Sequence, residues 1–264
     1  MHAFLISILV VYLLSNFSPP LDFPTGELVT LSFGISDMDV ADRLADQNVI
    51  KHPLIFVWVA RMLDRAGSLK AGRYVFNKPL PLWSVLGRIS NGEYGTQVRK
   101  VTVPEGFTNK QIGELFGQAW DETDQGYLFP DTYYLDEFAT EFEIRDKMKN
   151  NFIMKVGDIT VGVVIIASIL EEEIKHPEDL PIVAGILFKR LELDMPLQVD
   201  AVPETYKAKG LPAIPVSNPG PATIKAAFNP TKSKYLYYLT GRDGKTYYAR
   251  TFEEHKINKA KYLK

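Results

Sequence analysis

Three consecutive glutamates, residues 171–173, close an uncharged apolar stretch that covers residues 161–170. Positions three, four and seven apart share one face of a helix, so Glu171 lies on the same face as Ser168, Ala167 and Val164. A carboxylate on such a face loses solvation, which raises its pKa and suits it to act as a general acid near neutral pH. The alternative is a solvated helix end, because acidic runs usually lie at the surface.

A second polar pair follows in the segment LQVDA, residues 197–201, in which apolar and polar side chains alternate. This period of two predicts a short strand that carries Gln198 and Asp200 on one face. If these two side chains converge with Glu171 on one open groove, they form a polar catalytic cleft.

The composition argues against several other kinds of site. The 264 residues include no cysteine and only four histidines, without an HExxH pair, so neither a thiolate nucleophile nor a zinc enzyme is expected. Adjacent glutamates point to different helix faces, so residues 171–173 cannot share an ion, with or without Glu178. The formal net charge of −2 gives no sign of a nucleic-acid partner. We therefore expect no metal, no cofactor and no nucleic acid.

The glutamates require a helix to hold them, and the sequence predicts one over residues 158–176. Asp158 or Thr160 can cap its start, and Pro177 stops it. Its uncharged part is apolar nearly all round, which indicates a helix buried on every side and too short to cross a bilayer. Apolar positions spaced by three and four over residues 180–191 predict a second helix packed on the first.

Aromatic and amphipathic segments flank these two helices. The segment GYLFPDTYYL, residues 126–135, reads as core, although a tyrosine such as Tyr133 also suits sugar stacking at a groove. Residues 141–155 predict a helix with Phe142, Ile144, Met148 and Phe152 facing inward. Residues 235–239 and 246–249 predict a hairpin, and Thr251 caps a last helix with Glu254 at its third position.

The N-terminal part begins with an uncharged apolar run over residues 3–17. We expect an uncleaved membrane anchor there, because no basic start and no suitable cleavage site are present. The alternative is a buried N-terminal helix. Pro19 and Pro20 then open a linker.

An internal repeat follows, because VTLSFG at residues 29–34 recurs as VTVPEG at residues 101–106. Each copy predicts a strand, a glycine turn and an amphipathic helix. A helix over residues 53–64, a strand over 72–76 and a helix over 81–89 are expected between the copies. We expect residues 26–117 to form one small α+β binding module that contains both repeat strands.

Six segments in the C-terminal half resemble the endolytic murein transglycosylases, the YceG-like or MltG family. They are, in chain order, GYLFPDTYYL, IIASILEEE, VAGILFKRLELDMPLQVD, LPAIPVSNPGPATIKAAFNP, YLYYLTG and TFEEHKINKAKYL. The repeat, with LKAGRYVF between its copies, is similar to that family's LysM-like module. The resemblance implies an α+β protein with a membrane anchor helix and linker (1–25), a LysM-like peptidoglycan-contacting subdomain (26–117) and a YceG-like catalytic domain (118–264).

The resemblance also implies an activity and its residues. The family cleaves the bond between N-acetylmuramic acid (MurNAc) and N-acetylglucosamine (GlcNAc) within glycan strands and leaves 1,6-anhydro ends, as a lyase. Motif positions imply Glu171 as the catalytic residue. The implied substrate-binding residues are Glu173, Gln198, Asp200, Tyr206, Asn218 and Tyr133.

The implied surroundings are those of the cell wall. Peptidoglycan strands are the expected substrate, the membrane is contacted through the N-terminal helix, and peptidoglycan synthases are further candidate partners. The resemblance places a single-pass protein in the cell membrane with its catalytic domain on the wall-facing side.

The chain departs from the family pattern after Asp200, where it is shorter and lacks the first residues of a Tyr-Asn-Thr-Tyr segment. Residues 211–215 read LPAIP in place of Leu-Pro-Pro-Gly-Pro. These differences touch the expected cleft wall, so two alternatives stay open. One is a catalytically impaired peptidoglycan-binding scaffold, and the other is a hydrolase that uses Glu171, Asp200 and water. Anhydro ends, reducing ends or no cleavage would separate the three functions.

Overall fold

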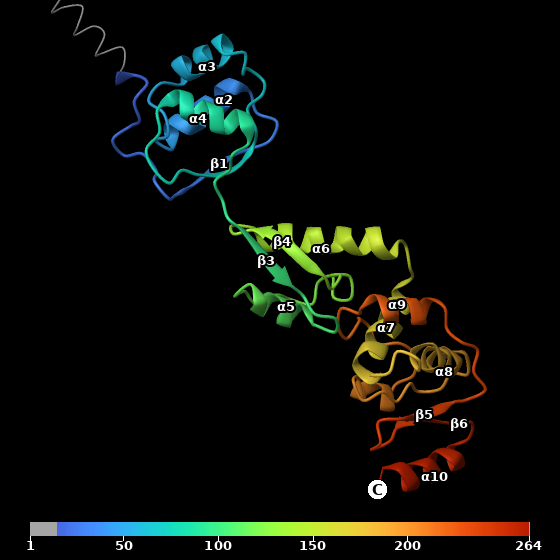
Figure 1. Cartoon of the computed structure of the whole chain (residues 1–264). Coiled ribbons are helices and arrows are strands. Elements are labelled where there is room, and N and C mark those ends of the chain that lie inside the picture. The colour runs from blue at the N-terminus through green and yellow to red at the C-terminus, as the bar shows by residue number, and fades with distance from the viewer. Residues whose placement is uncertain (1–14, 264) are drawn as a thin grey trace, which may run out of the picture. The chain divides into compact units, whose positions relative to one another are not determined.

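The computed structural model describes residues 15–263, and these fold into two compact units (Figure 1). One unit comprises Met1–Val98 with Asp136–Phe138, and the other comprises Arg99–Leu135 with Ala139–Lys264. The described residues form nine α-helices and three two-stranded sheets, which confirms the expected mixed α+β class. The expected anchor over residues 3–17 falls almost wholly outside the described residues.

The first unit combines one antiparallel sheet with three helices. Strands β1 (Leu28–Leu31) and β2 (Gly72–Val75) pair with Leu28 opposite Val75. The helices are α2 (Asp37–Asp46), α3 (Pro53–Met62) and α4 (Leu82–Asn91). A capping box between Ser36 and Asp39 starts α2, and Gly92 in the left-handed conformation ends α4. Apolar faces of these elements enclose a common core that includes Val29, Leu44, Phe56, Tyr74 and Leu86.

The two repeat strands do not share one lobe, which corrects the expectation for residues 26–117. β1 pairs with β2, whereas the second repeat strand, β3 (Val98–Thr102), pairs with β4 (Thr132–Asp136). Each copy nevertheless has the predicted local structure of strand, glycine turn and helix, the second helix being α5 (Asn109–Leu115). Both helices begin with a capping box, at Ser36 and at Thr108. Local sequence sets the turn and the caps, but the pairing partner of a strand is set by distant residues. The division between units accordingly falls at Val98 and not near residue 117.

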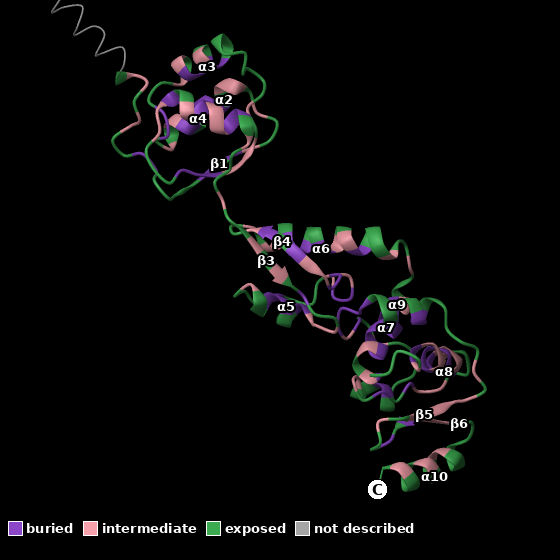
Figure 2. Cartoon of the chain, in the orientation of Figure 1, coloured by how far each residue is buried: buried purple, intermediate pink, exposed green. Residues whose placement is uncertain are grey.

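Helix α7 (Val161–Glu173) is the buried centre of the second unit (Figure 2). Every residue from Val164 to Leu170 is buried, which confirms the predicted all-round burial for that part of the helix, whereas Val161 in its first turn is 55% exposed. Helices α8 (Leu180–Glu192) and α9 (Pro221–Phe228) pack against it (Figure 1). The helix ends earlier than predicted, because Ile174 adopts an extended conformation and is itself buried.

A second layer of core in this unit involves β3, β4, α5 and α6 (Glu141–Val156). Its buried residues include Val103, Ile112, Trp120, Leu135 and Met148. Of the four residues of α6 predicted to face inward, Ile144, Met148 and Phe152 are buried. Phe142 is 77% exposed, so that prediction is wrong.

The C-terminal hairpin is formed by β5 (Tyr237–Thr240) and β6 (Thr246–Ala249), as predicted. Helix α10 (Phe252–Tyr262) follows, and the Thr251 hydroxyl accepts a hydrogen bond from the amide of Glu254. No residue of α10 is buried (Figure 2).

The predicted strand over residues 197–201 is absent, which is a second correction. Gln198 has a φ of 52°, which breaks an extended segment. The segment is held by Thr205 of the following 3₁₀ turn, η1 (Pro203–Tyr206). The hydroxyl of Thr205 accepts from the amide of Val199 at 3.0 Å, and its carbonyl accepts from the amide of Gln198 at 3.1 Å. Gln198 and Asp200 are nevertheless exposed on either side of buried Val199, as the alternation predicted.

Within residues 15–263, no single helix has both the length and the apolar character of a membrane span. Helices α6 and α7 reach that length and composition only together, and they meet at an angle of 99°.

Candidate active site

Glu171 lies in the last turn of α7, with its carboxylate at the N-terminus of α9. Its Oε2 accepts a hydrogen bond from the amide of Gly220 at 2.8 Å and another from the hydroxyl of Thr223 at 2.6 Å. Gly220 is the N-cap residue of α9, and the first amides of a helix are free donors that favour a negative partner. Among the described residues Oε1 has no hydrogen-bond partner, so one oxygen is held and the other can exchange a proton.

The face of α7 that carries Glu171 is also fixed one turn earlier, by Ser168. The Ser168 hydroxyl is buried and accepts from the amide of Val216 at 2.9 Å. This bond ties the segment that leads to Gly220 to the surface of α7. The predicted shared face of Val164, Ala167, Ser168 and Glu171 therefore packs against residues 215–220 and α9.

A second carboxyl group, that of Glu105, lies at the same place and was not among the predicted site residues. It belongs to the VPEG turn after β3, which is joined to Asn218 by two backbone hydrogen bonds. The amide of Gly106 donates to the carbonyl of Asn218 at 2.9 Å, and the amide of Asn218 donates to the carbonyl of Phe107 at 3.0 Å. In the sequence, a glutamate between Pro104 and Gly106 resembles an ordinary turn residue. Only the folded structure shows that Glu105 lies near Glu171.

Glu105 lines a groove of about 680 Å³ between the end of α6 and helix α9. Four other charged residues line this groove: Asp131, Lys155, Asp158 and Lys225. The ammonium of Lys155 pairs with Asp131 at 2.7 Å. Partial desolvation, and secondarily the charge of Glu171, raise the pKa of Glu105.

The remaining acidic and polar site residues gather elsewhere. Glu173, Gln198, Asp200 and Tyr206 line one cavity of about 560 Å³, together with Arg190 and Tyr238. Glu173 accepts from the amide of Ala201 at 2.8 Å, and the Tyr206 hydroxyl donates to Asp200 at 2.5 Å. Burial, and secondarily the charge of Asp200, raise the pKa of Glu173 against the opposing effect of the Ala201 amide.

Glu171 does not line this second cavity, so the predicted site is divided in two. The physical reason is helical geometry, because residues two apart on a helix project about 200° apart. Glu171 therefore faces α9 and Glu105, while Glu173 faces Ala201 and Asp200. The convergence of Glu171, Gln198 and Asp200 on a single groove is not observed.

Two predicted substrate-binding residues lie in the interior. Asn218 has no exposed surface, and its side-chain amide is fully used. Its Oδ1 accepts from the amides of Gly126 and Leu128, and its Nδ2 donates to Phe107 and Asn109. Tyr133 is also buried, and its hydroxyl donates to the carbonyl of Phe129. Neither side chain is placed to touch a glycan, and both act as internal supports.

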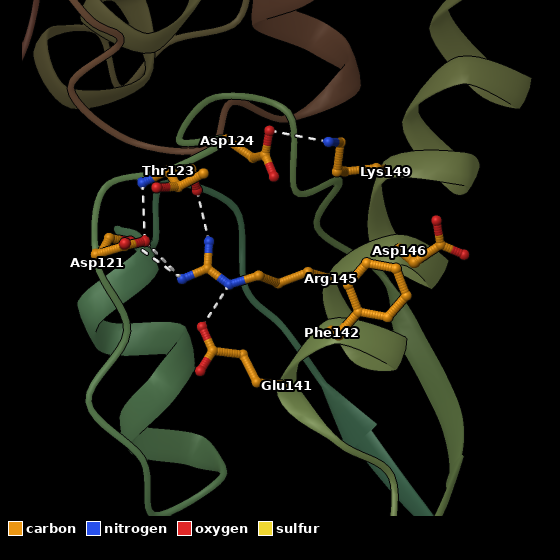
Figure 3. Close-up of a pocket in the computed structure, with 8 residues that line it drawn as sticks. All are labelled: Asp121, Thr123, Asp124, Glu141, Phe142, Arg145, Asp146 and Lys149. Carbon is orange, nitrogen blue, oxygen red and sulfur yellow. Dashed lines mark hydrogen bonds and ion pairs between the residues drawn. The ribbon is translucent and has the colours of Figure 1, made fainter.

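A third cavity, of about 480 Å³, contains no predicted site residue (Figure 3). Figure 3 shows the guanidinium of Arg145 between Asp121, the carbonyl of Thr123 and Glu141. Lys149 pairs with Asp124 at 2.9 Å nearby. Because its cations are already matched by acceptors of the chain, this cluster braces α6 against residues 121–124. Within residues 15–263 no group of three or more His, Asp or Glu side chains is placed to hold a metal ion.

Comparison with known protein families gives a match over most of this chain. The sequence model of the YceG-like family matches residues 29–203 and 204–261. The chain belongs to this family. Both carboxyl clusters lie within the matched residues, and the match extends through both compact units.

Two similar proteins carry descriptive names. The endolytic murein transglycosylase of Streptococcus pneumoniae strain R6 is 27% identical over 333 positions, which cover 92% of this chain and 60% of that protein. The endolytic murein transglycosylase of Bacillus subtilis strain 168 is 25% identical over 312 positions, with 92% and 86% covered. This YceG-like chain thus spans less than two thirds of the pneumococcal relative's length.

Both alignments are longer than the 264-residue chain, so the relatives carry additional residues between the matched segments. The short connection after Asp200 fits this difference. A crystal structure of a yceG-like protein from Listeria monocytogenes has a TM-score of 0.52 at 24% identity, and the match covers 88% of this chain and 98% of that one. This likeness shows the shared fold.

Proposed function

We propose that this chain is a peptidoglycan lytic transglycosylase that uses Glu171 first as an acid and then as a base. The observation that carries the proposal is the carboxyl group of Glu171, which has one oxygen held by Gly220 and Thr223 and one oxygen without a partner among the described residues. The substrate class comes from the relatives, which are named endolytic murein transglycosylases.

The first step is proton donation. Protonated Glu171 gives its proton to the glycosidic oxygen, the bond from that oxygen to C1 of MurNAc breaks, and GlcNAc leaves with a free hydroxyl. The carboxylate that forms is stabilised by the amide of Gly220 and the hydroxyl of Thr223, which are already in place before the reaction.

In the second step the same carboxylate accepts the proton of the C6 hydroxyl of MurNAc. The C6 oxygen attacks C1, and a 1,6-anhydro ring closes on the sugar. Glu171 is protonated again, so no proton is gained or lost over the cycle. A hydrolase would instead require a second carboxylate to activate water or to attack C1. Asp200 does not fit that role, because it lines the cavity that Glu171 does not reach.

The location of the protein is part of the same proposal. Residues 3–17 serve as a single membrane anchor, and the catalytic unit faces the cell wall. The N-terminal unit acts as the LysM-like contact to peptidoglycan, and peptidoglycan synthases are candidate partners. Recovery of the full-length protein in membranes, and its release by detergent but not by high salt, would support this placement. Recovery of the intact protein in the soluble fraction would contradict it.

Product analysis in H₂¹⁸O tests the reaction type. Purified glycan strands are digested with the wild-type chain, and the new ends are examined by mass spectrometry. A transglycosylase leaves anhydro ends that lack one water and carry no ¹⁸O, whereas a hydrolase leaves reducing ends with ¹⁸O. Binding of strands without any cleavage would favour the impaired scaffold, and the short connection after Asp200 would then be the first region to restore.

A further inference from the structure

Helix α3 is apolar on its outer side as well as on the side that faces the core. Phe56 and Ala60 are fully buried in the core of the first unit. Leu54, Trp58 and Met62 are spaced four residues apart, so they form one stripe along the helix, and they are 74%, 58% and 66% exposed. Surface helices normally turn polar residues to water, so this stripe indicates a face that binds another apolar phase.

The segment that leads out of the N-terminal apolar run is attached beside this stripe. Lys51 lies three residues before Leu54. Its ammonium donates hydrogen bonds to the carbonyl of Ser15 and to the hydroxyl of Ser18, both at 2.9 Å. The apolar residues 3–14 therefore join the fold next to the start of α3. A bilayer that holds these residues would adjoin the stripe.

A further exposed aromatic side chain lies at the same point of entry. The carbonyl of Phe17 accepts a hydrogen bond from the amide of Leu82 at 2.9 Å, and the ring centroids of Phe17 and Trp83 are 6.3 Å apart. Trp83 lies in the first turn of α4 and is 54% exposed. Tryptophan is enriched at the membrane–water interface, because its ring is apolar and its N–H can bond to polar groups. Trp58 and Trp83 are therefore side chains that suit this boundary.

The sequence around α3 is basic, in contrast to the whole chain with its formal net charge of −2. Residues 47–92 contain seven Lys and Arg residues and a single acidic residue, Asp64. One of the seven, Arg61, is exposed on α3 itself. Basic side chains beside exposed apolar ones are typical of helices that lie on the surface of anionic bilayers. The charge of this region is thus complementary to anionic lipid headgroups.

We propose that the stripe formed by Leu54, Trp58 and Met62, together with Trp83, lies in the interface of an anionic bilayer and forms a second membrane contact beside residues 3–14. Helix α3 has ten residues, so it is long enough to lie in the interface and too short to cross the hydrocarbon core. The inference rests on the proposed membrane placement and adds a surface to it. Two adjacent contacts fix the orientation of the first unit on the membrane, which a single anchor leaves free.

Quenching of tryptophan fluorescence by brominated lipids tests this contact in the full chain. The chain is reconstituted in vesicles of phosphatidylcholine and phosphatidylglycerol, with or without bromine on the acyl carbons nearest the headgroup. The third tryptophan, Trp120, is buried in the core of the second unit and supplies an unquenched component. We expect a quenched component that Trp58→Phe and Trp83→Phe each reduce. Quenching should weaken when phosphatidylglycerol is left out.

Polar substitutions test whether the stripe itself makes the contact. Leu54 and Met62 are exposed, so the double variant Leu54→Gln, Met62→Gln should fold as the wild type does. We expect this variant to lose most of the quenching of Trp58. The matched control is Ile153→Gln, which changes a 62% exposed apolar residue of α6 in the second unit and should leave the quenching unchanged. Equal quenching in the double variant and the wild type would overturn the inference.

Other occupants of the stripe give different results, and each of these would contradict the inference. If residues 3–14 or a second copy of the chain cover the stripe, the emission of Trp58 is shifted to the blue without quenching by brominated lipid. If the stripe binds glycan, added strands change the emission of Trp58 and lipid does not.

Flotation of the vesicles separates this inference from the proposed anchor. A chain that floats with the vesicles while Trp58 and Trp83 stay unquenched would refute the second contact and leave the anchor intact. A chain that does not float would refute both. Product analysis of glycan strands reports on the proposed reaction independently of either result.

Discussion

At the residue scale, the proposed chemistry depends on the unequal treatment of the two oxygens of Glu171. Oε2 is held by two donors at the start of α9, and Oε1 has no partner among the described residues. A hydrogen bond from a fixed hydroxyl to a carboxylate contributes about 1.5–3 kcal/mol, more than a bond between neutral groups. Thr223 therefore belongs to the site, although nothing about its position in the sequence indicates this role.

The first prediction concerns this hydroxyl. Thr223→Val has nearly the same shape and should pack as before, but it removes one donor from Oε2. We expect kcat for strand cleavage to fall about tenfold or more, because the carboxylate formed on proton donation is less stabilised. Thr223→Ser keeps the hydroxyl and is the matched control. Equal cleavage rates for Thr223→Val and wild type would show that the hydrogen bond from Thr223 to Glu171 has no catalytic role.

A second prediction at this scale concerns stability and pH. Hydrogen bonds from Lys155, Asn151 and the amide of Thr132 lower the pKa of Asp131 from its ordinary value of 3.8 to about 2. The ionised carboxylate therefore stabilises the fold at pH values above about 4, and this stabilisation is lost as the pH falls from 4 toward 2.

Urea unfolding measures this effect. Asp131→Asn should lower the free energy of unfolding at pH 7, and the gap to wild type should narrow as the pH falls below 4. Lys155→Gln removes the same ion pair and should lower stability at pH 7 in the same direction. A gap that stays constant from pH 7 to pH 2 would contradict the assignment of the pKa shift to these contacts.

At the scale of elements, the sequence predicted α7 and the burial of most of its residues, because an uncharged run that is apolar nearly all round leaves little surface for water. It also predicted the glycine turn and helix after each repeat strand, since both depend on neighbours in sequence. The pairing of β3 with β4 and the approach of Glu105 to Glu171 could not be predicted, because both depend on contacts between segments distant in the chain. The predicted strand over residues 197–201 failed because Gln198 takes a left-handed conformation that Thr205 holds in place.

The third prediction belongs to this scale, because Asn218 joins several segments. Its amide satisfies the buried amides of Gly126 and Leu128 and donates to Phe107 and Asn109. Asn218→Ala should leave these groups unpaired and lower the free energy of unfolding by about 2–4 kcal/mol. Thermal and urea unfolding measure the loss. Unchanged stability with a raised KM for strands would instead return Asn218 to the substrate-binding role predicted from sequence.

At the scale of the whole molecule, the chain encloses separate cores in two units, and the second unit holds both carboxyl clusters. The relatives align over more positions than this chain has residues, so this chain is shorter than they are between matched segments. The pair formed by Glu171 and Glu105 is fixed by α7, α9 and the VPEG turn, none of which includes the shortened segment after Asp200. We therefore expect the acid–base function to persist in the shorter chain, while the cavity of Glu173 and Asp200 carries the difference from the relatives.

The central claim is that one carboxyl group performs both proton transfers, and the most direct measurement is the yield of 1,6-anhydro ends by Glu171→Gln. The amide is close in size to the carboxyl group and can still accept from Gly220, so the fold and strand binding should persist. It can neither deliver nor accept the proton, and loss of such catalysis typically costs roughly 10² to 10⁴ in rate. We predict a folded protein that binds strands and forms no detectable anhydro ends under conditions in which wild type cleaves them. Anhydro ends formed at the wild-type rate by Glu171→Gln would contradict the account.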